Sequence, residues 1–282
     1  MPDSFNLADV FRMIGLHKFK IITVVVLSLI IASITLLLVP KYYKATAIVL
    51  PSNPELADKE RAAYNNLQRL YSYFGNNDDL DLLYGMAKLD TLYFRLTDSF
   101  NLANYYALNE MNASVNRFKA KQLLKKNIEF KKNENNQLEI SVWDKSNIQA
   151  TAIANAAVLF LKQSEESLWL SNYEKTYNAI KNQITNLQQQ LSLLSKQTST
   201  NATAQQITEQ TYQQQLAQYQ KNLSDLQLAI QNVAPGLYVV QYATPAIKPD
   251  KPKPILVLIA VACITFVIAT SGVLLYYRNK GE

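Results

Sequence analysis

The sequence is poor in the residues on which catalysis, metal binding and disulfide bonding usually depend. Its 282 residues include one cysteine, one histidine and six glycines. Cys263 lies inside an apolar stretch and His17 lies beside another, so a disulfide within the chain and a His/Cys metal cluster are both excluded. No G-x-x-x-x-G-K-[ST] phosphate loop is present. We therefore expect no cofactor, and no catalytic, cofactor-binding or metal-binding residues.

Acidic residues are the remaining candidates for chemistry. The pairs Asp78-Asp79 and Glu165-Glu166 consist of neighbours, which do not face each other on a helix, and they are more simply explained as capping or solvated charges. A glycosidase that takes two carboxylates from distant segments stays an alternative, and it would have to cleave a glycan. We predict a protein that is not an enzyme.

Positive charge also has a simple explanation. The formal net charge is +6, which would suit nucleic acid. The basic residues, however, are spread out or lie beside apolar stretches, where anionic lipid headgroups are the simpler partner. We predict no nucleic-acid partner.

What the chain does have is two long apolar stretches near its ends. Within residues 21–39 and 255–277, uncharged runs of about 19 and 21 residues can each cross a hydrocarbon core of roughly 30 Å. A cleavable signal peptide, with an A-x-A site at Ala45-Thr46-Ala47, is an alternative for the first stretch. Its apolar run is longer than the roughly 7–15 residues of a signal core, so we predict two transmembrane helices.

The charges beside these helices predict their orientation. Residues 1–20 form an amphipathic N-terminal segment that lies on the membrane surface. Arg12, Lys18, Lys20, Arg278 and Lys280 lie on the terminal sides of the two spans. Under the positive-inside rule, the segment 1–20 and the tail 278–282 are cytoplasmic, and residues 40–254 form a periplasmic or extracellular domain.

Residues 40–145 and 237–242 predict a small β-sheet with short helices. Aromatic and β-branched residues at 42–50 and 237–242 indicate strands, and alternating apolar residues on both sides of the polar turn 133–136 indicate a β-hairpin. We expect capping residues at Ser52-Asn53 followed by a helix to about Phe74, a break at residues 75–79, and shorter helices over residues 79–110.

Residues 146–233 carry the clearest helical pattern. Apolar residues step by four and three on both sides of a polar segment at residues 196–203, which is the spacing of a coiled-coil seam. We predict a long antiparallel helical hairpin. Its seam residues are Tyr173, Tyr177, Ile180, Ile184, Leu187, Leu191 and Leu194 on the first arm, and Tyr212, Leu216, Tyr219, Leu223, Leu226, Ile230 and Val233 on the second.

The symmetry of the two seams about residue 203 sets a register. Ile184 would face Leu223, and Lys181 would lie opposite Asp225 as a pair of unlike charges. Packing of one or both arms on the β-sheet or on neighbouring subunits stays an alternative, because periodicity alone does not identify the partner of an apolar stripe.

A proline-rich connector, residues 245–254, leads into the second span. Pro245, Pro249, Pro252 and Pro254 fix φ and remove backbone donors, so we predict an extended, semi-rigid segment. The connector would transmit the orientation of the domain to the span. A plain spacer is an equally good interpretation of the residues alone.

This arrangement of segments resembles that of a known family, the polysaccharide co-polymerases or chain-length determinant proteins (Wzz-type). The resemblance covers nearly the whole chain. It is carried by residues 40–45 (PKYYKA), residues 144–150 with Ile153-Ala154-Asn155, and most specifically residues 249–254 (PDKPKP) before the last span.

This resemblance implies an inner-membrane homo-oligomer whose periplasmic domains stand around a central space. Such a protein works with a polysaccharide polymerase in the inner membrane, and the growing lipid-linked glycan is a further candidate partner. It sets the modal length of O-antigen, capsule or exopolysaccharide. Because the sequence ends soon after the second span, we expect the branch without a kinase domain. The family has no settled catalytic residues to carry over.

The sequence therefore predicts an α+β membrane protein: two transmembrane helices flank a periplasmic domain with a small β-sheet and a long antiparallel helical hairpin. The leading function is a non-enzymatic scaffold that regulates polysaccharide chain length. A polysaccharide export subunit, an anchor for a separate kinase, and a membrane-tethered coiled-coil adaptor are the alternatives.

Overall fold

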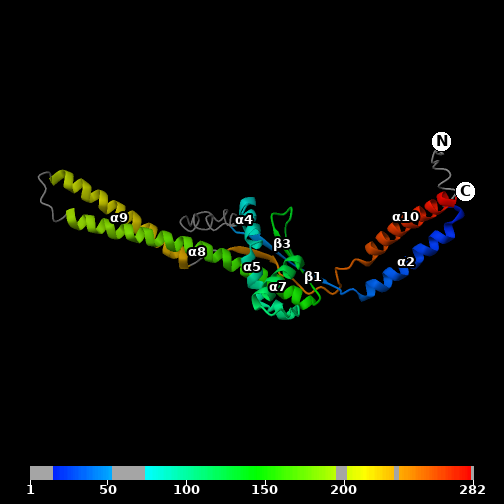
Figure 1. The fold of residues 1–282 in the computed structure, drawn as a ribbon. Helices are drawn as coiled ribbons and strands as arrows, with labels where there is room; N and C mark the ends of the chain where they lie inside the picture. The colour runs from blue at the N-terminus through cyan, green and yellow to red at the C-terminus, as the bar shows by residue number, and fades with distance from the viewer. Residues whose placement is uncertain (1–14, 53–73, 195–201, 232–234, 281–282) are drawn as a thin grey trace. The chain divides into compact units, whose positions relative to one another are not determined.

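The computed structural model describes residues 15–52, 74–194, 202–231 and 235–280 (Figure 1). Most of the amphipathic segment expected at residues 1–20, and nearly all of the helix expected up to Phe74, lie outside the described residues. The chain forms two compact units. The first comprises Met1–Lys44, Asp144–Asn147 and Ala246–Glu282, and the second comprises Ala45–Trp143 and Ile148–Pro245.

The first unit is built on a pair of long helices. Helices α2 (Lys18–Leu38) and α10 (Pro254–Lys280) pack against each other, and both are long and apolar enough to cross a membrane. Leu37 and Leu38 each expose 80% of their surface, which is unfavourable in water and favourable in hydrocarbon. The Ser28 hydroxyl donates a hydrogen bond to Thr265 Oγ1 at 3.1 Å, a polar link typical of helices paired in lipid.

The second unit contains a four-stranded sheet in the order β2-β3-β1-β4. Its strands are β1 (Tyr43–Pro51), β2 (Ile128–Lys132), β3 (Leu138–Asp144) and β4 (Leu237–Gln241). Strands β2 and β3 pair antiparallel, as do β1 and β4. On β1, the side chains of Ala45, Ala47 and Val49 alternate into the core. The small sheet predicted from the alternating residues is confirmed.

An asparagine fixes the turn between β2 and β3. Asn133 Oδ1 accepts hydrogen bonds from the amides of Asn135 and Gln137, both at 3.0 Å, which is a side-chain substitute for a backbone turn. Asn136 adopts a φ of 59°, a left-handed conformation that asparagine tolerates better than most residues. The polar turn 133–136 therefore sets the register of the hairpin.

Four shorter helices cover part of the sheet: α4 (Asn77–Ala87), α5 (Asp90–Ser99), α6 (Leu102–Tyr105) and α7 (Ala113–Asn127). Helix α7 lies beyond the range in which we predicted short helices. Of residues 75–79, expected as a break, residues 77–79 belong to α4 and Asn76 is its N-cap. The Asn76 side chain accepts hydrogen bonds from the amides of Asp78 and Asp79, and the Asp79 carboxylate accepts one from the Asn76 amide, a complete capping box.

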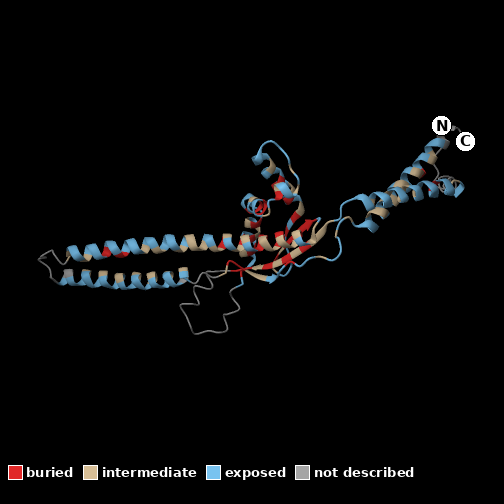
Figure 2. Ribbon diagram, turned by 90° about the horizontal axis from the view of Figure 1, so that it is seen from below, coloured by how far each residue is buried: buried red, intermediate tan, exposed pale blue. Residues whose placement is uncertain are grey.

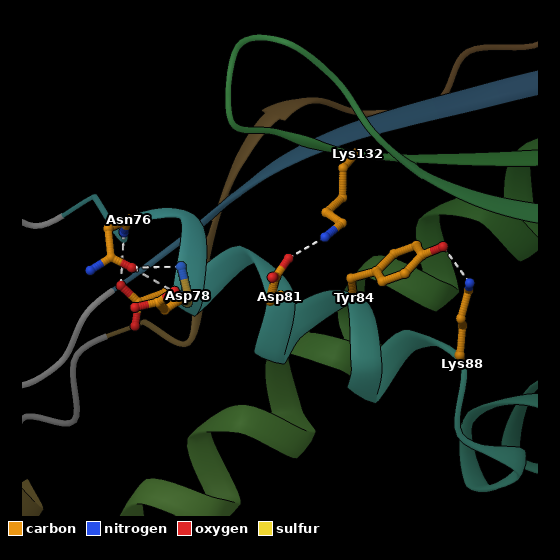
Figure 3. A network of polar contacts seen from close by, with 7 residues as sticks. Asn76, Asp78, Asp81, Tyr84, Lys88 and Lys132 are labelled. Atoms are coloured by element: carbon orange, nitrogen blue, oxygen red, sulfur yellow. Dashed lines mark hydrogen bonds and ion pairs between the residues drawn. The ribbon is translucent and has the colours of Figure 1, made fainter.

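Figure 3 shows this cap together with the side-chain contacts along α4. Lys132, at the end of β2, donates to the Asp81 carboxylate, and Lys88 donates to the Tyr84 hydroxyl one turn away. These groups are exposed, so each contact contributes at most about 1 kcal/mol. The Lys132–Asp81 contact links β2 to α4, while the buried Leu80 and Leu83 supply the packing.

A partly buried charge cluster joins α5 to α7. The Lys121 ammonium lies 3.0 Å from the Asp90 carboxylate and 4.6 Å from the ring centres of both Phe94 and Phe118. The hydrogen bond from Lys121 lowers the pKa of Asp90 below its usual value. Lys121 itself is 6% exposed, so its charge is held by a carboxylate and two aromatic faces.

The longest helix begins in the core and then leaves it. Helix α8 (Asn147–Leu194) is followed by α9 (Ala202–Gln231). The first turns of α8 bury one face against the sheet, through Ala150, Ile153, Ala154, Ala157 and Leu161. Beyond that part, Figure 2 shows α8 and α9 running side by side with covered positions along the stripe between them. The helical hairpin of the predicted fold is present.

Candidate functional site

The helical hairpin is the largest candidate working surface. Between Asn172 and Leu194, the covered positions of α8 are the seven predicted seam residues, and all other positions are exposed (Figure 2). Ile184 and Leu187 are the best covered, at 8% and 7% exposure. Burial every three or four residues on one stripe is the pattern of a helix packed against a single partner helix.

The second arm has the matching stripe. Tyr212, Leu216, Tyr219, Leu223, Leu226 and Ile230 are all partly covered, whereas Val233 lies outside the described residues. Tyr177 and Ile230 line one cavity of about 410 Å³ together with polar residues of both arms. These two residues would be close neighbours in the register expected from the symmetry of the seams.

One detail of that register is absent. Lys181 and Asp225, both described, form no ion pair within 4.0 Å. Both side chains are exposed, and solvent stabilises each separate charge almost as well as an exposed pair would. The arms therefore depend on the seam rather than on this pair.

The root of the hairpin is where the chain returns from α9 to the sheet. A Cβ atom added to Gly236 would lie 2.6 Å from Glu165 Cβ and 3.1 Å from the Lys162 carbonyl oxygen. Only glycine allows so close an approach to α8. The Ser52 hydroxyl, at the end of β1, donates to the carbonyl oxygens of Pro235 and Gly236. The return segment is thus held between β1 and α8.

Glu165 is enclosed by this packing. Glu165 is 5% exposed, and its Oε2 has no hydrogen-bond partner among the described residues. Burial, with smaller contributions from the negative charges of Asp79 and Glu166, raises the pKa of Glu165 to about 8. The only nearby cation on α8, Lys162, pairs with Glu166 at 3.9 Å. Glu165 is therefore mainly protonated at neutral pH, and we had wrongly expected it to be solvated or capping.

An asparagine holds the returning chain a second time. Asn155 Oδ1 accepts from the Ala243 amide at 2.8 Å, and Asn155 Nδ2 donates to the Ala243 carbonyl at 3.1 Å. One side chain thus satisfies both backbone groups of a residue that is 5% exposed. Closer to the spans, Asn147 Nδ2 donates to the Ala246 carbonyl at 3.0 Å.

The four connector prolines occupy different settings. Pro245 and Pro249 are exposed, Pro252 is partly covered and follows a cis peptide bond, and Pro254 is the first residue of α10. Proline suits that last position, since the first turn of a helix needs no amide donor there.

The connector is paired with the strand that leaves the first span. The Tyr42 amide donates to the Lys251 carbonyl at 2.9 Å, and the Asp250 amide donates to the Tyr42 carbonyl at 2.8 Å. The two connections between the spans and the rest of the chain are thus held together within the first unit.

Three residues at the hairpin root make contacts that we did not predict from the sequence. Glu165 lies in an acidic pair that is typical of an exposed helix surface. Its burial depends on Gly236, which is 71 residues away in the sequence. Asn155 was noted only as part of a resemblance, although an asparagine on the apolar face of a helix requires a partner. Ser52 was expected to cap a helix. Among the described residues, no group of three or more His, Cys, Asp or Glu side chains could hold a metal ion.

Comparison with known proteins identifies the N-terminal part of the chain. Residues 3–80 match the model of the family described as "Wzz: Chain length determinant protein", which confirms the resemblance over that segment. No curated protein matches the chain.

Several solved structures are also similar to the chain. A full-length bacterial polysaccharide co-polymerase is 14% identical, with 98% of this chain and 99% of that chain covered and a TM-score of 0.46. A fragment of WzzB, a polysaccharide co-polymerase from Salmonella Typhimurium, is 12% identical over 75% of this chain and 100% of that chain, with a TM-score of 0.35. The A107P mutant of the Shigella flexneri lipopolysaccharide O-antigen chain-length regulator WzzBSF is 14% identical. The match covers 74% of this chain and 100% of that chain, with a TM-score of 0.31.

Proposed function

Because residues 3–80 match the model of the Wzz chain length determinant family, we propose that this chain belongs to that family and regulates the modal length of a surface polysaccharide. The glycan would be O-antigen, capsule or exopolysaccharide. The family match is the observation that carries this proposal. The protein would act as a scaffold in the bacterial inner membrane, with cytoplasmic termini, a periplasmic main domain and no catalysis of its own.

The hairpin supports a scaffold because it is long and internally braced. Its first arm, α8, has 48 residues and would extend about 70 Å at the usual rise of a helix. The seam positions of α8 are covered, and its first turns are anchored in the core. A braced helix of this length can hold a partner or a growing glycan at a defined distance from the membrane.

Exposed apolar residues on the arms support assembly into a homo-oligomer. Leu159 and Leu168 on α8 are 49% and 46% exposed, and Leu228 on α9 is 53% exposed. Apolar side chains outside the seam gain little from solvent contact, and neighbouring copies would cover them. The oligomer would present its polymerase partner with a fixed geometry, and that geometry would influence when polymerisation stops.

The paired connections support a role for the membrane-proximal part. Since Tyr42 and the Asp250–Lys251 backbone are hydrogen-bonded, the two ends of the outer domain leave the spans as one element. The proline residues around position 251 limit its bending. A polymerase that contacts the paired helices would therefore meet two connecting segments that are hydrogen-bonded to each other rather than two independent ones.

The test is the length profile of the surface glycan, separated on a gel, from cells with and without the gene. Loss of the gene should convert a defined modal length into a short or random distribution, while repeat-unit synthesis continues. Re-expression of the full chain should restore the mode. An unchanged profile would contradict the proposal, and an unchanged profile with glycan retained inside the cell would favour an export role instead.

A further inference from the structure

A groove lies between the two long helices, at the ends that lead to the chain termini. It has a volume of about 280 Å³ and is lined by residues of both α2 and α10. Its apolar wall consists of Ile21 and Val24 on α2, and Ala269 and Val273 on α10. The hydrogen bond between Ser28 and Thr265 ties the helices together farther along, so the groove is an opening at one end of a packed pair.

A glycine makes room for this opening. Gly272 lines the groove, and a Cβ atom added there would meet no heavy atom within 4 Å. A larger side chain at position 272 would therefore extend into free space rather than collide with the partner helix. Glycine within a helix lowers stability relative to alanine. At position 272 the absence of a side chain leaves a space beside the apolar wall of the groove.

The mouth of the groove is polar and positively charged. His17, Lys20 and Tyr276 line it, and no carboxylate of the described residues does. Lys20 and His17 are three positions apart, so they lie on the same side of the chain as it enters α2. Lysine near the end of a span reaches toward the interface with its ammonium group, while its methylene stem stays in apolar surroundings.

We propose that this groove binds one anionic phospholipid. The phosphate would lie between Lys20 and His17, within reach of the Tyr276 hydroxyl, and one acyl chain would lie along Ile21, Val24 and Gly272. Basic pockets between membrane helices recognise anionic headgroups in this way. The volume lies at the lower limit of the roughly 300–1,000 Å³ of small-molecule pockets, which suits an acyl chain better than a bulky soluble ligand.

The polarity of the groove favours a lipid over other occupants. A free phosphate would use the mouth and leave the apolar wall empty, and a helix of a second copy would use the wall and leave Lys20 and His17 facing lipid. An anionic lipid matches both parts. The proposal is independent of the glycan function, because it requires only that α2 and α10 lie in a bilayer.

Native mass spectrometry of the purified full chain tests the proposal. The chain is released from detergent in the presence of phosphatidylglycerol or phosphatidylcholine with the same acyl chains, and the fraction that retains one lipid is measured. Two matched pairs of variants are compared. Lys20→Gln and Lys18→Gln each remove one charge at the same helix end, but Lys18 does not line the groove. Gly272→Leu and Ser271→Leu each add the same bulk, but only Gly272 lines it.

We expect the chain to retain phosphatidylglycerol about fivefold better than phosphatidylcholine, as the attraction of one lysine to an anionic lipid implies. Lys20→Gln should abolish this preference and Lys18→Gln should keep it. Gly272→Leu should reduce retention of both lipids, and Ser271→Leu should not. Gel filtration and circular dichroism verify that each variant is folded.

Four results would overturn the proposal. Equal effects of the two lysine variants would indicate general surface charge, and unchanged retention in Gly272→Leu would show that lipid lies elsewhere. Loss of retained phosphatidylglycerol on addition of inorganic phosphate would indicate a site for the free ion. If Gly272→Leu changes the number of associated subunits and not the bound lipid, the groove is a contact between copies.

Discussion

The buried carboxyl group at the hairpin root predicts an unusual dependence of stability on pH. The pKa of Glu165 is about 8 in the folded chain, against a usual value of 4.5. Below about pH 4.5 the group is protonated in both states, so its protonation does not affect the folding equilibrium. As the pH rises from there to about 8, the unfolded chain releases the proton that the folded chain keeps, and stability falls with pH.

The size of the effect follows from the same pair of values. Each pH unit between the two pKa values lowers the free energy of unfolding by up to about 1.4 kcal/mol. At pH 7 the free energy of unfolding is therefore lower by on the order of 3 kcal/mol than at pH 4.5. Glu165→Gln is neutral at every pH and nearly the same size. We predict that it is more stable than the wild type at pH 7, by on the order of 3 kcal/mol, and that the gain shrinks toward pH 5.

Thermal unfolding of the full chain in detergent, from pH 5 to pH 8.5, measures this difference. Trp169 is one helical turn from Glu165, and its fluorescence reports local opening at the hairpin root. Glu166→Gln is the matched control, since it removes a neighbouring carboxylate that is less buried and pairs with Lys162. Parallel pH curves for the wild type and Glu165→Gln would refute the reasoning, as would an equal effect of Glu166→Gln.

Two further variants test the packing of the returning chain. Gly236→Ala should lower the free energy of unfolding by about 1–3 kcal/mol, because its new Cβ lies 2.6 Å from Glu165 Cβ; Gly85→Ala, which meets no atom within 4 Å, should be neutral or stabilising in the same melts. Asn155→Ala should cost about 1–3 kcal/mol, because it leaves the amide and carbonyl of Ala243 without their partner. Asn155→Asp keeps the acceptor for the Ala243 amide but places a carboxylate oxygen against the Ala243 carbonyl, so it should be destabilising as well. Unchanged stability in either variant would contradict the two-bond arrangement.

The parts of the fold that follow from local pattern were predictable. The two long apolar helices, the strands around residues 133–136 and the hairpin arms each have a period or a turn signal that a few neighbouring residues determine. Helix α7 was missed because only Ala120, Lys121 and Leu124 are buried on it, which is too few for a periodic signal. Its attachment depends instead on Lys121 meeting Asp90 and two aromatic rings.

The hairpin root could not be predicted because its residues are remote from one another in the sequence. Glu165 resembles any acidic residue of a surface helix until Gly236 packs on it. Asn155 differs in kind, since a single amide within an apolar stripe is visible in the sequence. The partner backbone at Ala243 is set by the path of the chain after α9, and no local pattern specifies that path.

The seam of the hairpin offers the most direct test of the proposed scaffold. In cells that lack the gene, the modal glycan length is measured after re-expression, at equal protein level, of the full chain with Ile184→Asp or with Leu193→Asp. Ile184 is 8% exposed in the seam, whereas Leu193 is 61% exposed outside it. We predict that Leu193→Asp restores the mode and that Ile184→Asp, which places a charge between the arms, does not. A normal mode with Ile184→Asp would contradict control of length by the paired hairpin.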